Sequence, residues 1–346
     1  MTAASPALGL SVGATNLAAV TADHALTRKP VLTLYRQRSP EVGVPSENPQ
    51  LGEPGLVIPD FVGRVGDPDG IVAADGTTHR SEALLADGLR ALAHAATSGH
   101  ITLPEKVAVT YPAHWEAPAV DALGSALSRL AEWSNRPPTL IPDAAAALFA
   151  VRANPGIPAR GTVAVCDFGG SGTSVTVLDA GDDHPVAATV RHPDFSGDLI
   201  DQAVLTAVMA NLPEAGFFDP PGTSAVGSLN RLRAACRRAK EGLSSHTVVA
   251  LGLPGVSDEV RFTRTELDGA IRDSLNKFIS VLDETLARNG IRELAAVISV
   301  GGGAHIPAVT TTLSGHLGVP VVTTPRPHLT AAVGAALRAA GAGALT

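Results

Sequence analysis

The residues best suited to chemistry in this sequence are an aspartate and the glycines that follow it. Asp167 comes directly after the apolar run 163–166, and the chain continues with Gly169, Gly170 and Gly172. Glycines allow a tight turn whose backbone N–H groups can bind phosphate oxygens. A carboxylate beside such a turn is suited to hold a metal ion, or a water on that ion. Taken alone, an ordinary β-hairpin with a glycine-rich turn is the simpler interpretation of this stretch.

The elements that must position this turn are repeated in the chain. A first turn at 13–16 and a second at 169–173 each join two predicted strands, and helices and strands then alternate in each half. A segment rich in proline and glycine separates the halves, so we predict one lobe at 1–156 and another at 157–346. The duplication predicts an α/β protein with a cleft between two similar lobes, where ligands bind in such architectures.

Two further predicted elements matter for the site. Residues 186–191 are predicted to pair as a further strand of the second half. A basic helix is predicted at 229–243, and its apolar face indicates that most of its arginines lie on the solvated side.

Composition excludes several classes of function. The 346 residues, 45% of them hydrophobic, are enough for two lobes with a sizeable core. A formal net charge of −7 argues against an extended nucleic-acid or anionic-membrane surface. No apolar run is long enough to cross a bilayer, and no secretory signal is present at the N-terminus. Because Cys166 and Cys236 cannot form a disulfide framework, we expect buried thiols and a cytoplasmic protein.

The motifs in this order resemble the nucleotide-binding domain of DnaK-type heat-shock 70 chaperones, within the actin/hexokinase superfamily. The most specific match is 232–245, which is similar to the family's adenosine helix. The other matching segments are 9–17, 106–112, 141–148, 167–173, 299–307 and 327–336. The resemblance implies a two-lobed actin-like ATPase fold, with each lobe built on a ribonuclease-H-like mixed sheet flanked by helices. It also implies that the chain lacks the family's peptide-binding domain.

The resemblance further implies a site for ATP or ADP with Mg²⁺. Asp167 and Asp143 would be its acids, and Asp167 would hold the metal through water. Gly197 lies in a segment similar to the turn that contacts the terminal phosphate, although the preceding Ser196 is equally suited to cap a helix. The residues that would contact nucleotide are Gly13, Ala14, Thr15, Asn16, Gly169, Gly170, Ser171, Gly197, Arg237, Lys240, Glu241, Ser244, Gly301, Gly302, Gly303, His305 and His328.

The chain departs from the family pattern at positions that carry charge. Ser11 and Ser174 stand where the two turns have aspartates, and we can assign no counterpart to the family's phosphate-stabilising lysine. Phosphoryl transfer depends on positioning and charge neutralisation. One preorganised group of this kind is worth roughly 3 to 4 kcal/mol, so we expect hydrolysis to be slow or absent. The departures around the base are Arg237, Glu241, His305 and His328.

We therefore favour a weak nucleotide binder or pseudo-ATPase that acts as a regulatory or protein-interaction module with an unknown protein partner. One alternative is an active Mg²⁺-dependent ATPase with a chaperone-like role, using Asp167 and Asp143. Another is a scaffold that binds no nucleotide. A sugar or acetate kinase is disfavoured because no convergent acid–base pair is evident. The lone histidines His114 and His192 are more typical of surface or capping groups.

Overall fold

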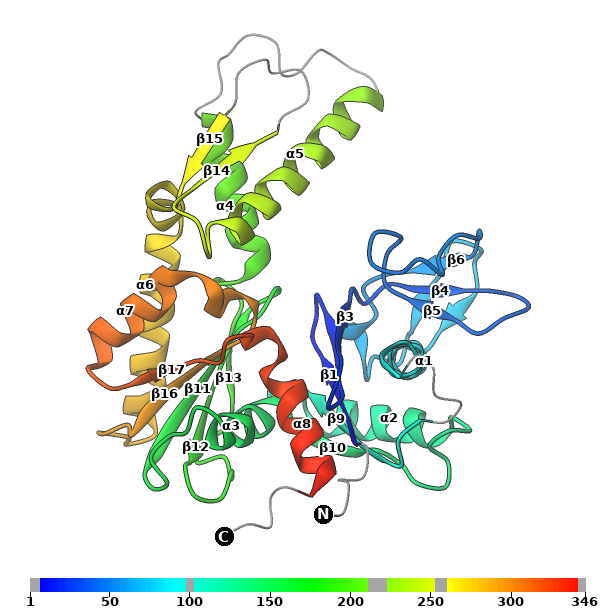
Figure 1. Cartoon of the computed structure of the whole chain (residues 1–346), viewed down its shortest axis with the longest axis horizontal. Helices are drawn as coiled ribbons and strands as arrows, with labels where there is room; N and C mark the ends of the chain where they lie inside the picture. Colours follow the sequence, from blue (N-terminus) through cyan, green and yellow to red (C-terminus); the bar gives the residue numbers. More distant parts are fainter. Residues whose placement is uncertain (1–6, 98–102, 211–222, 253–259, 342–346) are drawn as a thin grey trace.

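The computed structural model describes residues 7–97, 103–210, 223–252 and 260–341, which form two lobes (Figure 1). Each lobe holds a five-stranded mixed sheet, ordered β10-β9-β1-β2-β3 in the first and β13-β12-β11-β16-β17 in the second. The strands of the first sheet are β1 (Ala7–Val12), β2 (Leu17–Val20), β3 (Ala25–Arg28), β9 (Lys106–Tyr111) and β10 (Thr139–Pro142). Those of the second are β11 (Thr162–Phe168), β12 (Thr173–Asp179), β13 (Val190–His192), β16 (Ala296–Val300) and β17 (Val321–Val322).

The predicted duplication is confirmed at the level of strand pairing. In each sheet the first strand pairs antiparallel with the next strand along the chain and parallel with a later one. The pair Val12–Leu17 closes the first turn and the pair Phe168–Thr173 closes the second. The second turn is therefore residues 169–172, because Thr173 already belongs to β12. Both turns have the same length and the same place in their sheets.

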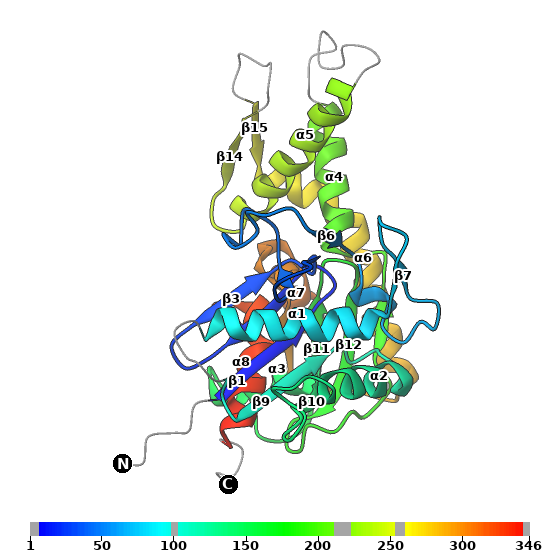
Figure 2. The same cartoon turned by 90° about the vertical axis from the view of Figure 1, so that its right-hand side faces the viewer.

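Apolar helix faces bury one face of the first sheet. The helices are α1 (Ser81–Ala96), which Figure 2 shows lengthwise, and α2 (Ala117–Ser128). Leu85, Leu89 and Leu123 are fully buried against Leu8 and Leu10 of β1. Burying such a side chain contributes about 1.5 to 3 kcal/mol, so this cluster fixes β1 and the turn that follows it.

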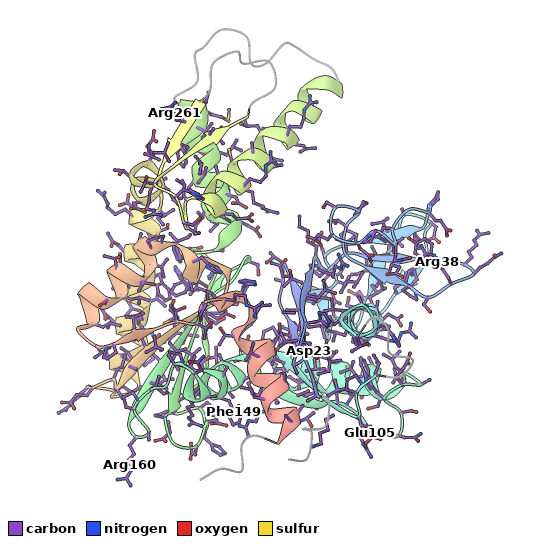
Figure 3. All side chains as sticks on the ribbon, viewed as in Figure 1. Asp23, Arg38, Glu105, Phe149, Arg160 and Arg261 are labelled. Atoms are coloured by element: carbon purple, nitrogen blue, oxygen red, sulfur yellow. The ribbon has the colours of Figure 1, made fainter. Side chains whose placement is uncertain are left out.

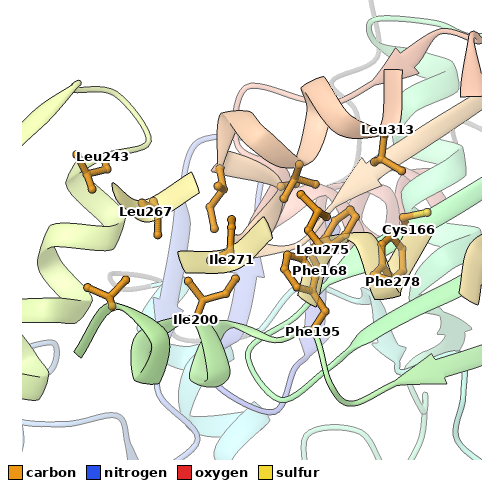
Figure 4. Packing of buried hydrophobic residues seen from close by; sticks show 14 of the residues in the cluster. Cys166, Phe168, Phe195, Ile200, Leu243, Leu267, Ile271, Leu275, Phe278 and Leu313 are labelled. Carbon is orange, nitrogen blue, oxygen red and sulfur yellow. The ribbon is translucent and has the colours of Figure 1, made fainter. Parts of the chain in front are cut away.

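The second lobe has a larger core with an aromatic centre. Three buried rings meet there: the Phe168 and Phe278 centroids are 5.2 Å apart, and Phe195 lies 6.0 Å from Phe168 (Figure 4). Phe168 is the last residue of β11, so this packing anchors the second turn. The covering helices are α4 (Gly197–Ala210), α6 (Arg264–Arg288) and α7 (Pro307–Leu317). Thr263 and Glu266 form a capping box that begins α6.

Two helices join the lobes. Buried alanines of α3 (Asp143–Ala153) pack on the second sheet, whereas α8 (Thr330–Ala340) packs on β1 and β9 of the first. The helices contact each other closely, since a Cβ on Gly334 would lie 1.8 Å from the Ala146 carbonyl oxygen. The Arg338 guanidinium lies 4.8 Å from the ring centroid of Phe149 (labelled in Figure 3). The packing of α3 and α8 thus crosses the boundary predicted between residues 156 and 157. That boundary stays a prediction.

Smaller elements extend both lobes. The helix α5 and the β14–β15 hairpin project from the second lobe (Figure 1). Their bounds are α5 (Thr223–Gly242), β14 (Val248–Leu251) and β15 (Val260–Thr263). The first lobe carries β4 (Leu32–Leu34), β5 (Glu41–Val42), β6 (Leu56–Ile58), β7 (Ile71–Val72) and β8 (Thr78–His79). Three short 3₁₀ segments among the described residues are η1 (Val62–Arg64), η2 (Gly302–His305) and η3 (Pro327–Leu329).

Candidate functional site

A cleft of about 2090 Å³ lies between the lobes. It is lined by both turns, by α5, and by η2 and η3. Every residue predicted to contact nucleotide lines this cleft, as do Asp143, Asp167 and Ser11. The structure therefore brings together residues that lie more than 300 positions apart in the sequence.

The two glycine turns meet at the bottom of the cleft. A Cβ on Gly170 would lie 2.1 Å from the Thr15 methyl carbon, so only glycine lets the Thr15 side chain lie here. Among the described residues, the N–H groups of Gly170 and Ser171 donate to no protein acceptor, and the same holds for Ala14 and Thr15. Four backbone donors are thus open to an anion, as in the phosphate-binding turns of other proteins.

Gly197 has a different role from the predicted phosphate contact. Its N–H donates to the Gly169 carbonyl at 3.0 Å, and the N–H of Asp198 donates to the Gly170 carbonyl at 2.9 Å. The Ser196 hydroxyl accepts from the N–H of Leu199 at 3.2 Å, which confirms the helix-capping interpretation. Because its amide is already used, Gly197 holds the second turn in place and offers no free donor to a ligand.

The cations of α5 are paired with an aspartate of α4. Arg237 Nε donates to Asp201 Oδ2 at 2.8 Å, and Lys240 Nζ lies 2.7 Å from Asp201 Oδ1. Lys240 also donates to the Gly197 carbonyl at 3.1 Å. The hydrogen bond to Asp201 is the main cause that raises the pKa of Arg237. These contacts position α5 along the cleft and partly neutralise its charge, while Glu241 contributes a carboxylate to the same lining.

A histidine pair lies where the resemblance places the base. His305 Nε2 and His328 Nδ1 are 3.0 Å apart, so one ring donates a hydrogen bond to the other. Burial lowers the pKa of both side chains, which favours the neutral form of each ring. Gly301 is needed just before this pair. Its φ is +84°, and a Cβ there would lie 2.2 Å from Asp167 Oδ1.

Asp143 and Asp167 face the same part of the cleft. Asp143 is the first residue of α3, and its Oδ1 accepts from the N–H groups of Ala113 at 3.0 Å and Ala144 at 2.7 Å. Burial raises the pKa of both carboxyl groups above their usual range. The negative charge of Asp167 raises the pKa of Asp143 further. Ionisation of one acid therefore disfavours ionisation of the other, unless a cation lies beside them.

That cation is Arg191, which the sequence analysis placed only at the end of a strand. The register aligns Asp167 of β11 with Ser174 of β12, and Ser174 with Arg191 of β13. Arg191 Nη2 donates to Ser171 Oγ in the second turn at 2.7 Å. Its charge lowers the pKa of both acids, and burial lowers its own pKa. Only the strand pairing reveals this neighbour.

The two lone histidines differ from expectation. His114 lines the cleft, with Nδ1 3.5 Å from Ser174 Oγ, and burial lowers its pKa to about 4. His114 is therefore neutral in the cleft wall at physiological pH. His192 is buried beside Phe278, at 6.2 Å between ring centroids, and is neither a surface nor a capping group.

The donor set fits a resident magnesium ion poorly. Mg²⁺ prefers a near-octahedral set of oxygen ligands drawn from carboxylates, phosphates and water. Among the residues that the structure describes, no group of three or more acids, histidines or cysteines could hold a metal ion. Serines occupy two of the acid positions, and a guanidinium faces the two remaining carboxylates.

The model of the family described as Hsp70 protein matches residues 73–342, which is most of the chain. The matched region includes the second turn, α5, both histidines of the pair and both acids. In the part of the chain that the structure describes, no helix is long and apolar enough to cross a membrane.

Proposed function

This chain belongs to the Hsp70 family and is a nucleotide-binding Hsp70-like domain. We propose that it binds ATP or ADP weakly and is a pseudo-ATPase. In this proposal the domain regulates or recruits a protein partner. The observation that carries the proposal is the contrast within one cleft. Backbone donors for phosphate are retained in both turns, while two acids of the hydrolytic set are replaced by Ser11 and Ser174. Backbone amides bind phosphate whatever the side chain, so binding outlasts the loss of catalysis.

The chain's own residues divide the work of binding. The open amides of the two turns bind phosphate oxygens, and Gly301 lets the chain pass close to Asp167. The wall formed by α5 and the histidine pair faces the nucleoside. The Mg²⁺ that accompanies nucleotide in this family neutralises phosphate charge when it is bound; no step here depends on it, because the donor set fits it poorly.

Calorimetric titration of the full chain with ADP and ATP tests the binding. We expect heat and a rise in melting temperature at millimolar nucleotide, with no release of phosphate above the blank. The variant Ser171→Glu places a carboxylate among the open amides and should abolish binding, since like charge repels phosphate. Ser280→Glu, on the exposed face of α6, is the matched control and should bind normally. No heat and no thermal shift with the unaltered chain would establish the scaffold alternative.

A slow ATPase is a second candidate, and one observation favours it. Arg191 supplies a cation next to Asp167 and Asp143, the element that the sequence analysis could not assign. If phosphate release is measurable, Asp167→Asn should lower it about 100-fold, as for other preorganised charged groups. Unchanged turnover in that variant would rule out this mechanism.

The compartment and the partner stay proposals. Cys166 and Cys236 are free and buried, as expected for thiols in a reducing compartment such as the cytoplasm. The net charge of −7 supports a protein partner rather than nucleic acid. Crosslinking in the presence and absence of ADP would show whether a partner depends on nucleotide.

A further inference from the structure

A row of side chains crosses the second sheet where its strands reach the cleft. Asp167, Ser174 and Arg191 occupy directly paired positions on β11, β12 and β13. Paired residues in a sheet point to the same face, with Cβ atoms about 4.5 to 5.5 Å apart. All three line the cleft, so this shared face is the cleft face. The row brings a carboxylate, a small hydroxyl and a guanidinium together.

The small side chain of Ser174 leaves room for the Arg191 guanidinium between the strands. The Ser174 side chain is small and buried, so the guanidinium can pass over it toward Asp167 and toward the second turn. Arg191 Nη2 donates to the Ser171 hydroxyl at 2.7 Å and lies close to Gly172, where a Cβ would come within 2.9 Å of that nitrogen. The guanidinium is therefore held against the turn whose amides are open to an anion.

The charges at this place have the pattern of a metal site with the metal replaced. Two acidic side chains, Asp143 and Asp167, line the cleft together with Arg191, and each interacts electrostatically with its guanidinium. A guanidinium forms strong paired hydrogen bonds with phosphate and keeps its charge at any physiological pH. A magnesium ion entering here would meet a fixed positive charge at close range.

We infer that the Arg191 guanidinium binds the terminal phosphate of the nucleotide in the place of a divalent metal ion, so that nucleotide binding does not require Mg²⁺. The inference rests on the proposed nucleotide binding and adds the ligand's form: metal-free ADP or ATP. Arg191 and the open amides of Gly170 and Ser171 then contact the same phosphate group. Asp167, in the same row, and Asp143 interact electrostatically with the guanidinium and partly balance its charge.

Calorimetric titration of the full chain with ADP, in excess EDTA and in millimolar Mg²⁺, tests this. We expect affinity in EDTA to equal or exceed that in Mg²⁺. Arg191→Gln should weaken ADP binding in EDTA about tenfold or more, as expected on losing hydrogen bonds to a charged group. Arg191→Lys, which keeps the charge but loses the planar fork, should fall in between. Arg160→Gln is the control, because Arg160 is exposed and points away from the second lobe (Figure 3).

The outcomes separate the two proposals. Binding that appears only with Mg²⁺ overturns the role of Arg191 and leaves the proposed nucleotide binding intact. Binding in EDTA that Arg191→Gln leaves unchanged, with the variant's melting temperature preserved, also overturns it. No binding in either condition overturns the proposed function itself. The comparison of EDTA with Mg²⁺ needs no variant, so it decides even if the Arg191 substitutions fail to fold.

Discussion

The two glycine turns are built alike and charged differently. Ser11 and Asp167 occupy the same position, one residue before the end of β1 and of β11. Ser11 pairs with Ala18, which pairs with Thr27, and this row across the first sheet is uncharged. The corresponding row in the second sheet is Asp167, Ser174 and Arg191.

This difference separates two kinds of function. Open backbone donors occur in both turns because four-residue connections between paired strands leave them free. Charge occurs only in the row beside the second turn, because it depends on the individual side chains of Asp167 and Arg191. Both lobes therefore offer backbone donors to an anion, while only the second lobe adds charged side chains beside its turn.

The largest expected effect concerns the contact that holds the two turns at one cleft. Gly334→Val should lower the free energy of unfolding by about 3 kcal/mol or more, since its Cβ would overlap the Ala146 carbonyl oxygen. Urea denaturation measures the change. Gly315→Ala on α7, where a Cβ meets nothing within 4 Å, is the control and should not destabilise. Equal stability of the two variants would mean that α3 and α8 do not pack closely.

Direct contact between the turns predicts coupled substitutions. Gly170→Ala should cost about 2 kcal/mol, because its Cβ would overlap the Thr15 side chain. Thr15→Gly removes that side chain, so the double variant should recover most of the loss. A double-mutant cycle from denaturation curves gives the coupling. Strictly additive effects would show that the turns do not touch.

The charge difference predicts unequal responses to a new acid. Ser174→Asp should weaken ADP binding in EDTA about tenfold, about 1.4 kcal/mol, because the new carboxylate would pair with Arg191 across the strands. Ser11→Asp has no arginine across from it and should change affinity less, roughly twofold. Calorimetry on both variants checks the order. A larger loss from Ser11→Asp would contradict the asymmetry described here.

The smallest effect is on pH dependence. Burial raises the pKa of Asp143 to about 7 in the folded chain, well above that of an exposed aspartate, so folding favours binding of a proton between these values. The resulting stability is present at low pH and is lost as pH rises through the raised pKa. Asp143→Asn still accepts from Ala113 and Ala144 through Oδ1, so it should raise the melting temperature slightly at pH 8 and not at pH 4. An equal shift at both pH values would mean that folding does not raise the pKa of Asp143.

Much of the fold could be read from local patterns. Alternating apolar residues and glycines predicted both turns, their strands and the two-lobed α/β fold, because local backbone preferences encode these features. The helix cap at Ser196 was also legible locally. The packing of α8 on the first sheet was not, because nothing near residue 330 indicates a contact with β1.

The sequence alone determined the family and the backbone donors, since these depend on glycine positions and motif order. Only the tertiary structure decided that the Gly197 amide is already used and that Arg191 faces Asp167 and Asp143. The physical reason is strand register. Asp167 and Arg191 are 24 positions apart, and they become neighbours in the same row only when three strands pair in one alignment.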